Sequence, residues 1–169
     1  MGQACLRVFD AAALKYACAS ASASPRKRAN LNVHRTLEDP IQRMLNVFQP
    51  GTYVRPHRHE PHRFELFLLL TGRAGLLTFD EGGAVSETAI LEPGAVWAVE
   101  LPGFVWHTVV SFADDTALFE IKPGPYTALA DKDFAPWAPS EDCPDAQALI
   151  ETWRRHVERL PSLDARPPA

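Results

Sequence analysis

Four residues of this chain carry the side chains that a divalent transition metal binds: His57, His59, Glu65 and His107. His57 and His59 are two positions apart, which places both imidazoles on one face of a β-strand. Three neutral imidazoles and one carboxylate suit Fe, Mn, Ni, Cu or Zn, and the sequence does not choose among these metals. We therefore expect one divalent transition metal, provided that the fold brings Glu65 and His107 beside the histidine pair.

The elements that would position these residues are short strands. Apolar runs of strand length alternate with turn signals such as Pro50-Gly51 and Gly82-Gly83. Little room is left for helices, so the pattern predicts an antiparallel barrel or sandwich, in which inward side chains of neighbouring strands converge. The expected strands cover residues 44–48, 53–59, 64–70, 75–79, 85–90, 96–101, 105–112 and 116–122.

The two ends of the chain predict short helices. The alanine-rich stretch 11–18 and the amphipathic stretch 145–160 have helical patterns. A short strand is expected at Leu6–Phe9 and another at residues 30–34, where polar and apolar residues alternate. We expect one domain in three parts: an N-terminal extension that packs on the barrel, the β-barrel itself, and a C-terminal segment with its helix, at residues 1–36, 37–126 and 127–169.

Composition excludes several classes of partner. A net charge of -4 gives no reason to expect nucleic acid. No run of ~18 apolar residues exists, so we expect no membrane span. Three cysteines without C-x-x-C spacing predict reduced thiols in a cytoplasmic protein. The expected partner is a small molecule.

The spacing of the metal-binding residues resembles the two motifs of the cupin superfamily. Gly51, His57-Arg-His59, Glu65 and Gly72 are similar to the first motif, and Pro102 with His107 to the second. The resemblance implies a mainly β fold, the cupin double-stranded β-helix or jelly-roll barrel, and a metal held by the two histidines, Glu65 and His107. Five residues separate His59 from Glu65, where the family has three or four, so Glu60 and His62 are alternatives to Glu65.

Several further segments resemble the WbuC family of cupin metalloproteins. That family is associated with bacterial O-antigen and polysaccharide gene clusters. The resemblance implies a metal-dependent role on a small sugar-derived or carboxylated molecule, and it leaves isomerase, oxygenase and lyase activities open. The segments that carry it are residues 24–34, 42–46, 53–59, 106–108, 122–126 and 132–139.

The sequence does not identify catalytic residues. Tyr53, His34 and Glu120 are candidates for a general base, and Arg55 could orient an anionic substrate or form a salt bridge at the barrel mouth. A polar set of strand residues lines a pocket or pairs with loop backbone. The set comprises Asn30, Asn32, His34, Gln42, Arg43 and Asn46.

Two questions of function and assembly stay open in the sequence. A non-catalytic cupin that binds or senses a small ligand is the alternative to an enzyme. The strand around Leu66, Leu68 and Leu70 is apolar on both faces, so one face packs on a second sheet, on the C-terminal helix or on a second subunit. A homodimer is therefore among the expected assemblies.

Overall fold

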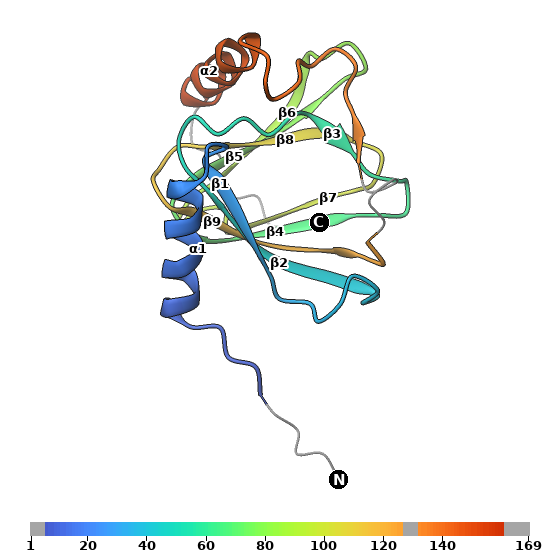
Figure 1. The fold of residues 1–169 in the computed structure, drawn as a ribbon. Coiled ribbons are helices and arrows are strands. Elements are labelled where there is room, and N and C mark those ends of the chain that lie inside the picture. The colour runs from blue at the N-terminus through green and yellow to red at the C-terminus, as the bar shows by residue number, and fades with distance from the viewer. Residues whose placement is uncertain (1–5, 127–131, 161–169) are drawn as a thin grey trace.

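Two five-stranded antiparallel sheets face each other in the computed structural model, which describes residues 6–126 and 132–160 (Figure 1). The first sheet has the order β1 (Arg28–Asn32), β2 (Ile41–Phe48), β9 (Thr116–Pro123), β4 (Glu65–Thr71) and β7 (Ala98–Leu101). The second has the order β10 (Asp133–Phe134), β3 (His57–Arg58), β8 (Trp106–Ser111), β5 (Ala74–Phe79) and β6 (Val85–Leu91).

Apolar side chains fill one part of the space between the sheets. Phe67 and Leu118 of the first sheet are buried with Leu76, Leu91 and Val109 of the second. Each alternates along its strand with a residue of the opposite face, as a half-buried strand requires. This apolar part closes one side of the interior, and a polar cavity occupies another part.

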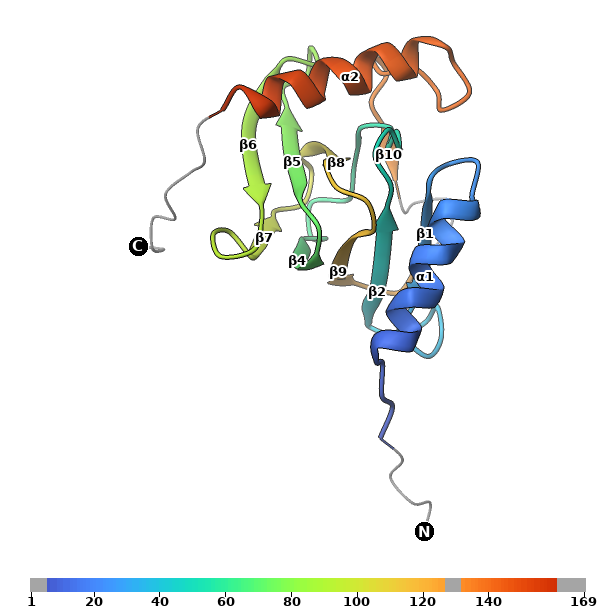
Figure 2. The same ribbon diagram turned by 90° about the vertical axis from the view of Figure 1, so that its left-hand side faces the viewer.

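A helix covers the outer face of each sheet (Figures 1 and 2). Helix α1 (Ala11–Ala23) begins after Asp10, whose carboxylate accepts hydrogen bonds from two backbone N–H groups of the first turn. Its Ala17 and Ala21 pack on Leu45 and Val47 of the first sheet. The helix extends five residues beyond the predicted 11–18, because the small residues that follow let it stay close to the sheet.

Helix α2 (Asp145–Glu158) lies on the second sheet, where Ile150, Trp153 and Val157 are buried. Neither described helix is long and apolar enough to cross a membrane. Residues 1–5 of the expected N-terminal extension, and residues 127–131 and 161–169 of the expected C-terminal segment, lie outside the described residues.

Two predicted strands are wrong. Residues 6–10 form no strand before α1, and only His57–Arg58 of the predicted strand 53–59 is a strand. Pro56 has no N–H to donate to a ladder. The carbonyl of Val54 instead accepts a hydrogen bond from the Thr108 hydroxyl at 2.6 Å. Side chains in this irregular segment therefore do not alternate as those of a strand would.

Gly72 connects β4 to β5 in a conformation that only glycine adopts easily. Its φ is +83°, and a Cβ at this position would lie 2.6 Å from the Cα of Thr116. The turn therefore needs a residue without a side chain. This explains why the motif glycine recurs seven positions after Glu65.

Replacing Trp153 with alanine should lower the free energy of unfolding by about 3–5 kcal/mol, the cost of removing a buried aromatic side chain. The indole is 4% exposed and stacks on Tyr53 with ring centroids 5.9 Å apart. Urea denaturation measures the change. Trp97→Ala is the matched control: Trp97 is 67% exposed, so its loss should change stability by no more than about 0.5 kcal/mol. Equal effects of the two substitutions would contradict the packing described for α2.

Tyr53 should make stability depend on pH in alkali. Burial raises the pKa of the Tyr53 phenol to about 12, and its hydroxyl donates to the carbonyl of Pro139 at 2.9 Å. Its contribution is fully present below the unfolded pKa of about 10. It is lost as pH rises through the folded pKa, because only the unfolded chain ionises in that interval. Unfolding free energies measured at pH 9 to 12 should fall less steeply in Tyr53→Phe than in the native chain.

Candidate metal centre

Three strands bring the four predicted metal-binding residues together. His57 lies in β3 opposite His107 in β8, Glu65 is the first residue of β4, and His59 follows β3 directly. One potential ligand atom from each of the four lies within 4.8 Å of all the others. All four residues are buried, between 3% and 4% exposed. The group could therefore hold a single metal ion between the two sheets.

Backbone carbonyls fix the orientation of two of the imidazoles. Nδ1 of His57 is 3.0 Å from the carbonyl of Arg55, and Nδ1 of His107 is 2.9 Å from that of Val105. A carbonyl only accepts, so each Nδ1 carries the proton and donates it. In a neutral ring, Nε2 then has its lone pair directed away from that carbonyl. This is the usual way in which a protein orients a histidine that ligates a metal.

The Nε2 atoms of His59 and His107 lie beside the Glu65 carboxylate, which has no proton to donate. Nε2 of His107 lies 2.8 Å from Oε2 of Glu65, and Nε2 of His59 lies 3.0 Å from Oε1. With His107 in the tautomer set by its Nδ1, two acceptor atoms face each other at this distance. Such a contact is favourable only with a cation or a proton between the atoms. A divalent metal supplies that charge, so the donor set fits a metal.

The protonation states also suit a metal. Burial alone would raise the pKa of Glu65, but positive charge and hydrogen bonds from His107 and His59 outweigh it and hold that pKa well below its ordinary value. A bound metal would take the place of that positive charge. Burial, together with the positive charge of Lys132, lowers the pKa of His57 well below its ordinary value. At neutral pH, Glu65 is therefore an anion and His57 is neutral, and these are the forms that ligate metals.

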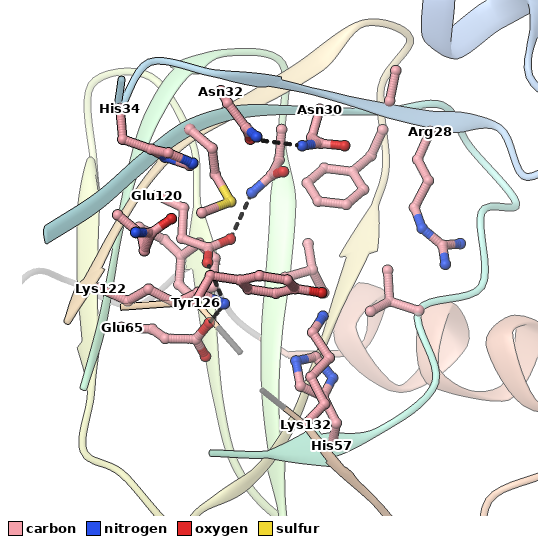
Figure 3. Close-up of a pocket in the computed structure, with 18 of the residues that line it drawn as sticks. Arg28, Asn30, Asn32, His34, His57, Glu65, Glu120, Lys122, Tyr126 and Lys132 are labelled. Carbon is pink, nitrogen blue, oxygen red and sulfur yellow. Dashed lines mark hydrogen bonds and ion pairs between the residues drawn. The ribbon is translucent and has the colours of Figure 1, made fainter. Parts of the chain in front are cut away.

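We call His57, His59, Glu65 and His107 together the metal group. This group opens onto a cavity of about 520 Å³, shown in Figure 3. His57, Glu65 and His107 line it, so a bound metal would face the cavity rather than a closed coordination sphere. Among the described residues, cations outnumber carboxylates in the wall, and they still do when Glu141, which pairs with both arginines, is counted. This excess favours an anionic ligand. The cations are Arg26, Arg28, Lys122 and Lys132, and the carboxylates are Glu65 and Glu120.

Of the four candidate catalytic residues, two line the cavity and two lie elsewhere. His34 and Glu120 line it. Tyr53 is buried against α2, on the other side of the second sheet. Arg55 donates to the carbonyl of Ala135 and stacks on Phe134. Tyr53 and Arg55 lie in the irregular segment 52–56, so alternation along one strand does not place them on the face of His57.

Glu120 is the cavity carboxyl best placed for proton transfer. Its Oε2 accepts a hydrogen bond from Asn46 at 2.6 Å, and its Oε1 lies 3.3 Å from Nζ of Lys122. Burial raises the pKa of Glu120, Lys122 opposes this effect, and the charge of Glu65 adds to it. A raised pKa makes a carboxyl a better proton acceptor than an ordinary glutamate, which suits a general base.

The alternatives to Glu65 lie outside the group. Glu60 and His62 are exposed on the turn between β3 and β4, and they are near each other, with Nε2 of His62 3.7 Å from Oε2 of Glu60. The same turn is closed by a hydrogen bond from the N–H of Arg63 to the carbonyl of Glu60. It accommodates the extra residue between His59 and Glu65.

The predicted polar set divides between the cavity and the backbone. Asn30, Asn32 and Asn46 line the cavity. Gln42 also borders it, but its Nε2 is engaged by the carbonyls of Leu37 and Asp39. His34 lines the cavity too, whereas Arg43 pairs with Asp39 at 2.7 Å and does not line it.

Sequence reasoning missed two lysines of the cavity. Lys122 lies on the same face of β9 as Glu120, so the alternation that selected Glu120 could have found it. Lys132 immediately precedes β10, which reaches the site by pairing with β3. Nothing near it in the sequence indicates that pairing.

Comparisons with known proteins show the fold more clearly than the family. A family model described as a domain of unknown function (DUF6016) matches residues 9–91. No curated protein matches the chain. Among solved structures, the capsular polysaccharide assembling protein CapF from Staphylococcus aureus is 17% identical with a TM-score of 0.53, over 62% of this chain and 28% of that chain.

The match to this chain spans a larger share of two other solved structures. A cupin superfamily protein from Desulfitobacterium hafniense is 20% identical with a TM-score of 0.45, over 57% of this chain and 76% of that chain. KdgF from Halomonas sp. is 19% identical with a TM-score of 0.47, over 63% and 84%. The predicted mainly β jelly-roll barrel with a helix near each end is confirmed by the two antiparallel sheets and the two helices, and the fold of CapF is similar to it.

Removing a metal-binding imidazole should abolish metal binding while the fold is retained. We expect His57→Ala and His107→Ala to weaken metal binding by more than about 100-fold. Loss of a residue that only hydrogen-bonds to a metal ligand weakens binding by up to about 100-fold, and loss of a ligand itself should cost more. Elemental analysis of untagged, dialysed protein measures the bound metal, and circular dichroism checks the fold. His62→Ala removes an exposed imidazole near the same turn and should leave metal content unchanged. Normal metal content in both alanine variants would rule out the assignment.

Proposed function

We propose that this protein is a metal-dependent enzyme that acts on a small, anionic, hydroxyl-rich molecule. The observation that carries the proposal is the metal group at the wall of an open cavity lined by cations. His57, His59, Glu65 and His107 hold the metal, which supplies a Lewis acid for substrate oxygens when bound. Lys122 and Lys132 attract the anionic group of the substrate.

The proposal includes a role for Glu120 as the acid–base residue. It lies in the cavity, and Asn46 and Lys122 hold its two oxygens in place. Of the four catalytic candidates from the sequence, we keep Glu120 for proton transfer and His34 for a contact with the substrate. Tyr53 and Arg55 support the outer layers of the barrel.

The substrate class that we propose is a carboxylated sugar derivative in bacterial polysaccharide metabolism, in the cytoplasm. Three observations support this class: cations suit a carboxylate, amides in the cavity suit hydroxyl groups, and several segments resemble the WbuC family. CapF, whose fold is similar, is itself described as a capsular polysaccharide assembling protein. The reaction type stays open among isomerase, oxygenase and lyase chemistry.

Turnover that needs both the metal and Glu120 tests the proposal. Protein stripped with a chelator and reloaded separately with Mn, Fe, Ni, Cu or Zn is incubated with uronic acids and short hydroxy acids, and products are followed by NMR. We expect at least one loaded form to turn over a uronic acid, and the stripped form to be inactive. Glu120→Gln should keep its metal and lose at least about 100-fold in rate, the contribution typical of a general acid or base.

The same experiment separates the enzyme from a binding protein. Metal-dependent binding of a uronic acid without any turnover would overturn the enzymatic proposal in favour of the alternative, a non-catalytic cupin that senses a ligand. Full activity of Glu120→Gln would overturn the role of Glu120 alone. A stripped form as active as the loaded forms would overturn the metal dependence.

A further inference from the structure

Strand β1 presents a polar side to the cavity along its whole length. Arg28, Asn30 and Asn32 in the strand, and His34 just after it, all line the cavity. Ala29 and Leu31 pack toward α1, although Ala29 also borders the cavity. Asparagine is depleted in strands, so two asparagines on one side of a five-residue strand need a reason that secondary structure does not supply.

This polar row lies across the cavity from the metal group. In Figure 3, Arg28, Asn30, Asn32 and His34 follow one strand, whereas Glu65, Lys132 and His57 lie on the opposite side of the open space. From Arg28 to Asn32 the strand measures about 13 Å at the ~3.3 Å rise of a strand. That length exceeds the span of one pyranose ring.

The row offers hydrogen bonds rather than free charge. Arg28 donates to the carbonyl of Tyr53 at 2.7 Å and forms an ion pair with Glu141, which also pairs with Arg26 at 2.8 Å. The charge of Arg28 is therefore already engaged by a carboxylate. Asn30 and Asn32 are exposed to the cavity and share one hydrogen bond of 2.9 Å, so most of their amide capacity is available to a ligand.

His34 gives independent evidence of a missing partner. Its side chain is 6% exposed, and its Nδ1 is engaged by the backbone of Arg43. Its Nε2 is buried and has no hydrogen-bond partner among the described residues, although the residue lines the cavity. A buried ring nitrogen in this position needs a hydrogen-bonding group from a ligand or from water.

We propose that the cavity has two subsites and that its ligand is longer than one sugar ring. The anionic sugar unit binds beside the metal group, with Lys122 and Lys132. A second, uncharged hydroxylated unit lies along β1, where Asn30, Asn32 and His34 bind its hydroxyl groups. The ligand is then an acidic disaccharide or a similar glycoside of a sugar acid. This inference rests on the proposed function and adds the second unit.

Calorimetric binding of three probes to the metal-loaded protein tests the inference. The probes are glucuronic acid, cellobiouronic acid, in which the same acid is linked to one neutral glucose, and the neutral disaccharide cellobiose. We expect cellobiouronic acid to bind at least about tenfold more tightly than glucuronic acid, the factor that two neutral hydrogen bonds contribute. Cellobiose should bind more weakly than either acid.

Variants of β1 should remove the advantage of the longer probe. In the double variant Asn30→Ala/Asn32→Ala, cellobiouronic acid should bind only as tightly as glucuronic acid, whose affinity should not change. Each single variant should lose about threefold, which keeps the test valid if the double variant unfolds. Gln147→Ala, which removes an exposed amide of α2 outside the cavity, should leave all three affinities unchanged.

The outcomes separate this inference from the proposed function. Equal affinity of the native protein for the two acids would overturn the second subsite and leave the proposed function standing. A tenfold preference that persists in the double variant would overturn the role of β1. Binding of cellobiose as tight as that of the acidic disaccharide would overturn the anionic subsite. No binding of either acid would overturn the proposed function, and this inference with it.

Discussion

The contact between one carboxylate and two imidazole nitrogens governs the rest of this structure. Glu65 places an oxygen within 3.0 Å of Nε2 in His59 and in His107, inside a protein where such groups are shielded from water. Burying a charge is costly unless it is paired. Lys122, 3.7 Å from Oε1 of Glu65, supplies part of the positive charge that this carboxylate needs, and a metal between the carboxylate and the imidazoles would supply more. The carbonyl of Val105 fixes the ring of His107 in this contact, and the carbonyl of Arg55 fixes that of His57, the third imidazole.

The helices and the interior of the barrel have different roles in this structure. Helices α1 and α2 bury the outer faces of the sheets, and their apolar contacts supply stability outside the barrel. Part of the inner space can then remain polar and open. This division explains why a mainly β protein of this size holds amides, lysines and carboxylates between its sheets without losing its core.

Most strands could be predicted from the sequence, because they follow local alternation. The meeting of His57, His59, Glu65 and His107 could be predicted because their spacing resembles the two cupin motifs. Alternation located β2, β4, β5, β6, β8 and β9 to within a few residues. It failed at Tyr53 and Arg55, where Pro56 and the bond to Thr108 override the strand pattern. Lys132 was beyond prediction, since it reaches the cavity only through the pairing of β10 with β3.

The two-sided character of β1 constrains how this gene can change. Because consecutive residues point to opposite sides, inserting or deleting one residue within β1 would turn Leu31 toward the cavity and Asn30 toward α1. Docking of the first helix and recognition at the cavity would then fail together. Point substitutions can alter one side at a time, so divergence in this segment should proceed by replacement, while its length stays constant.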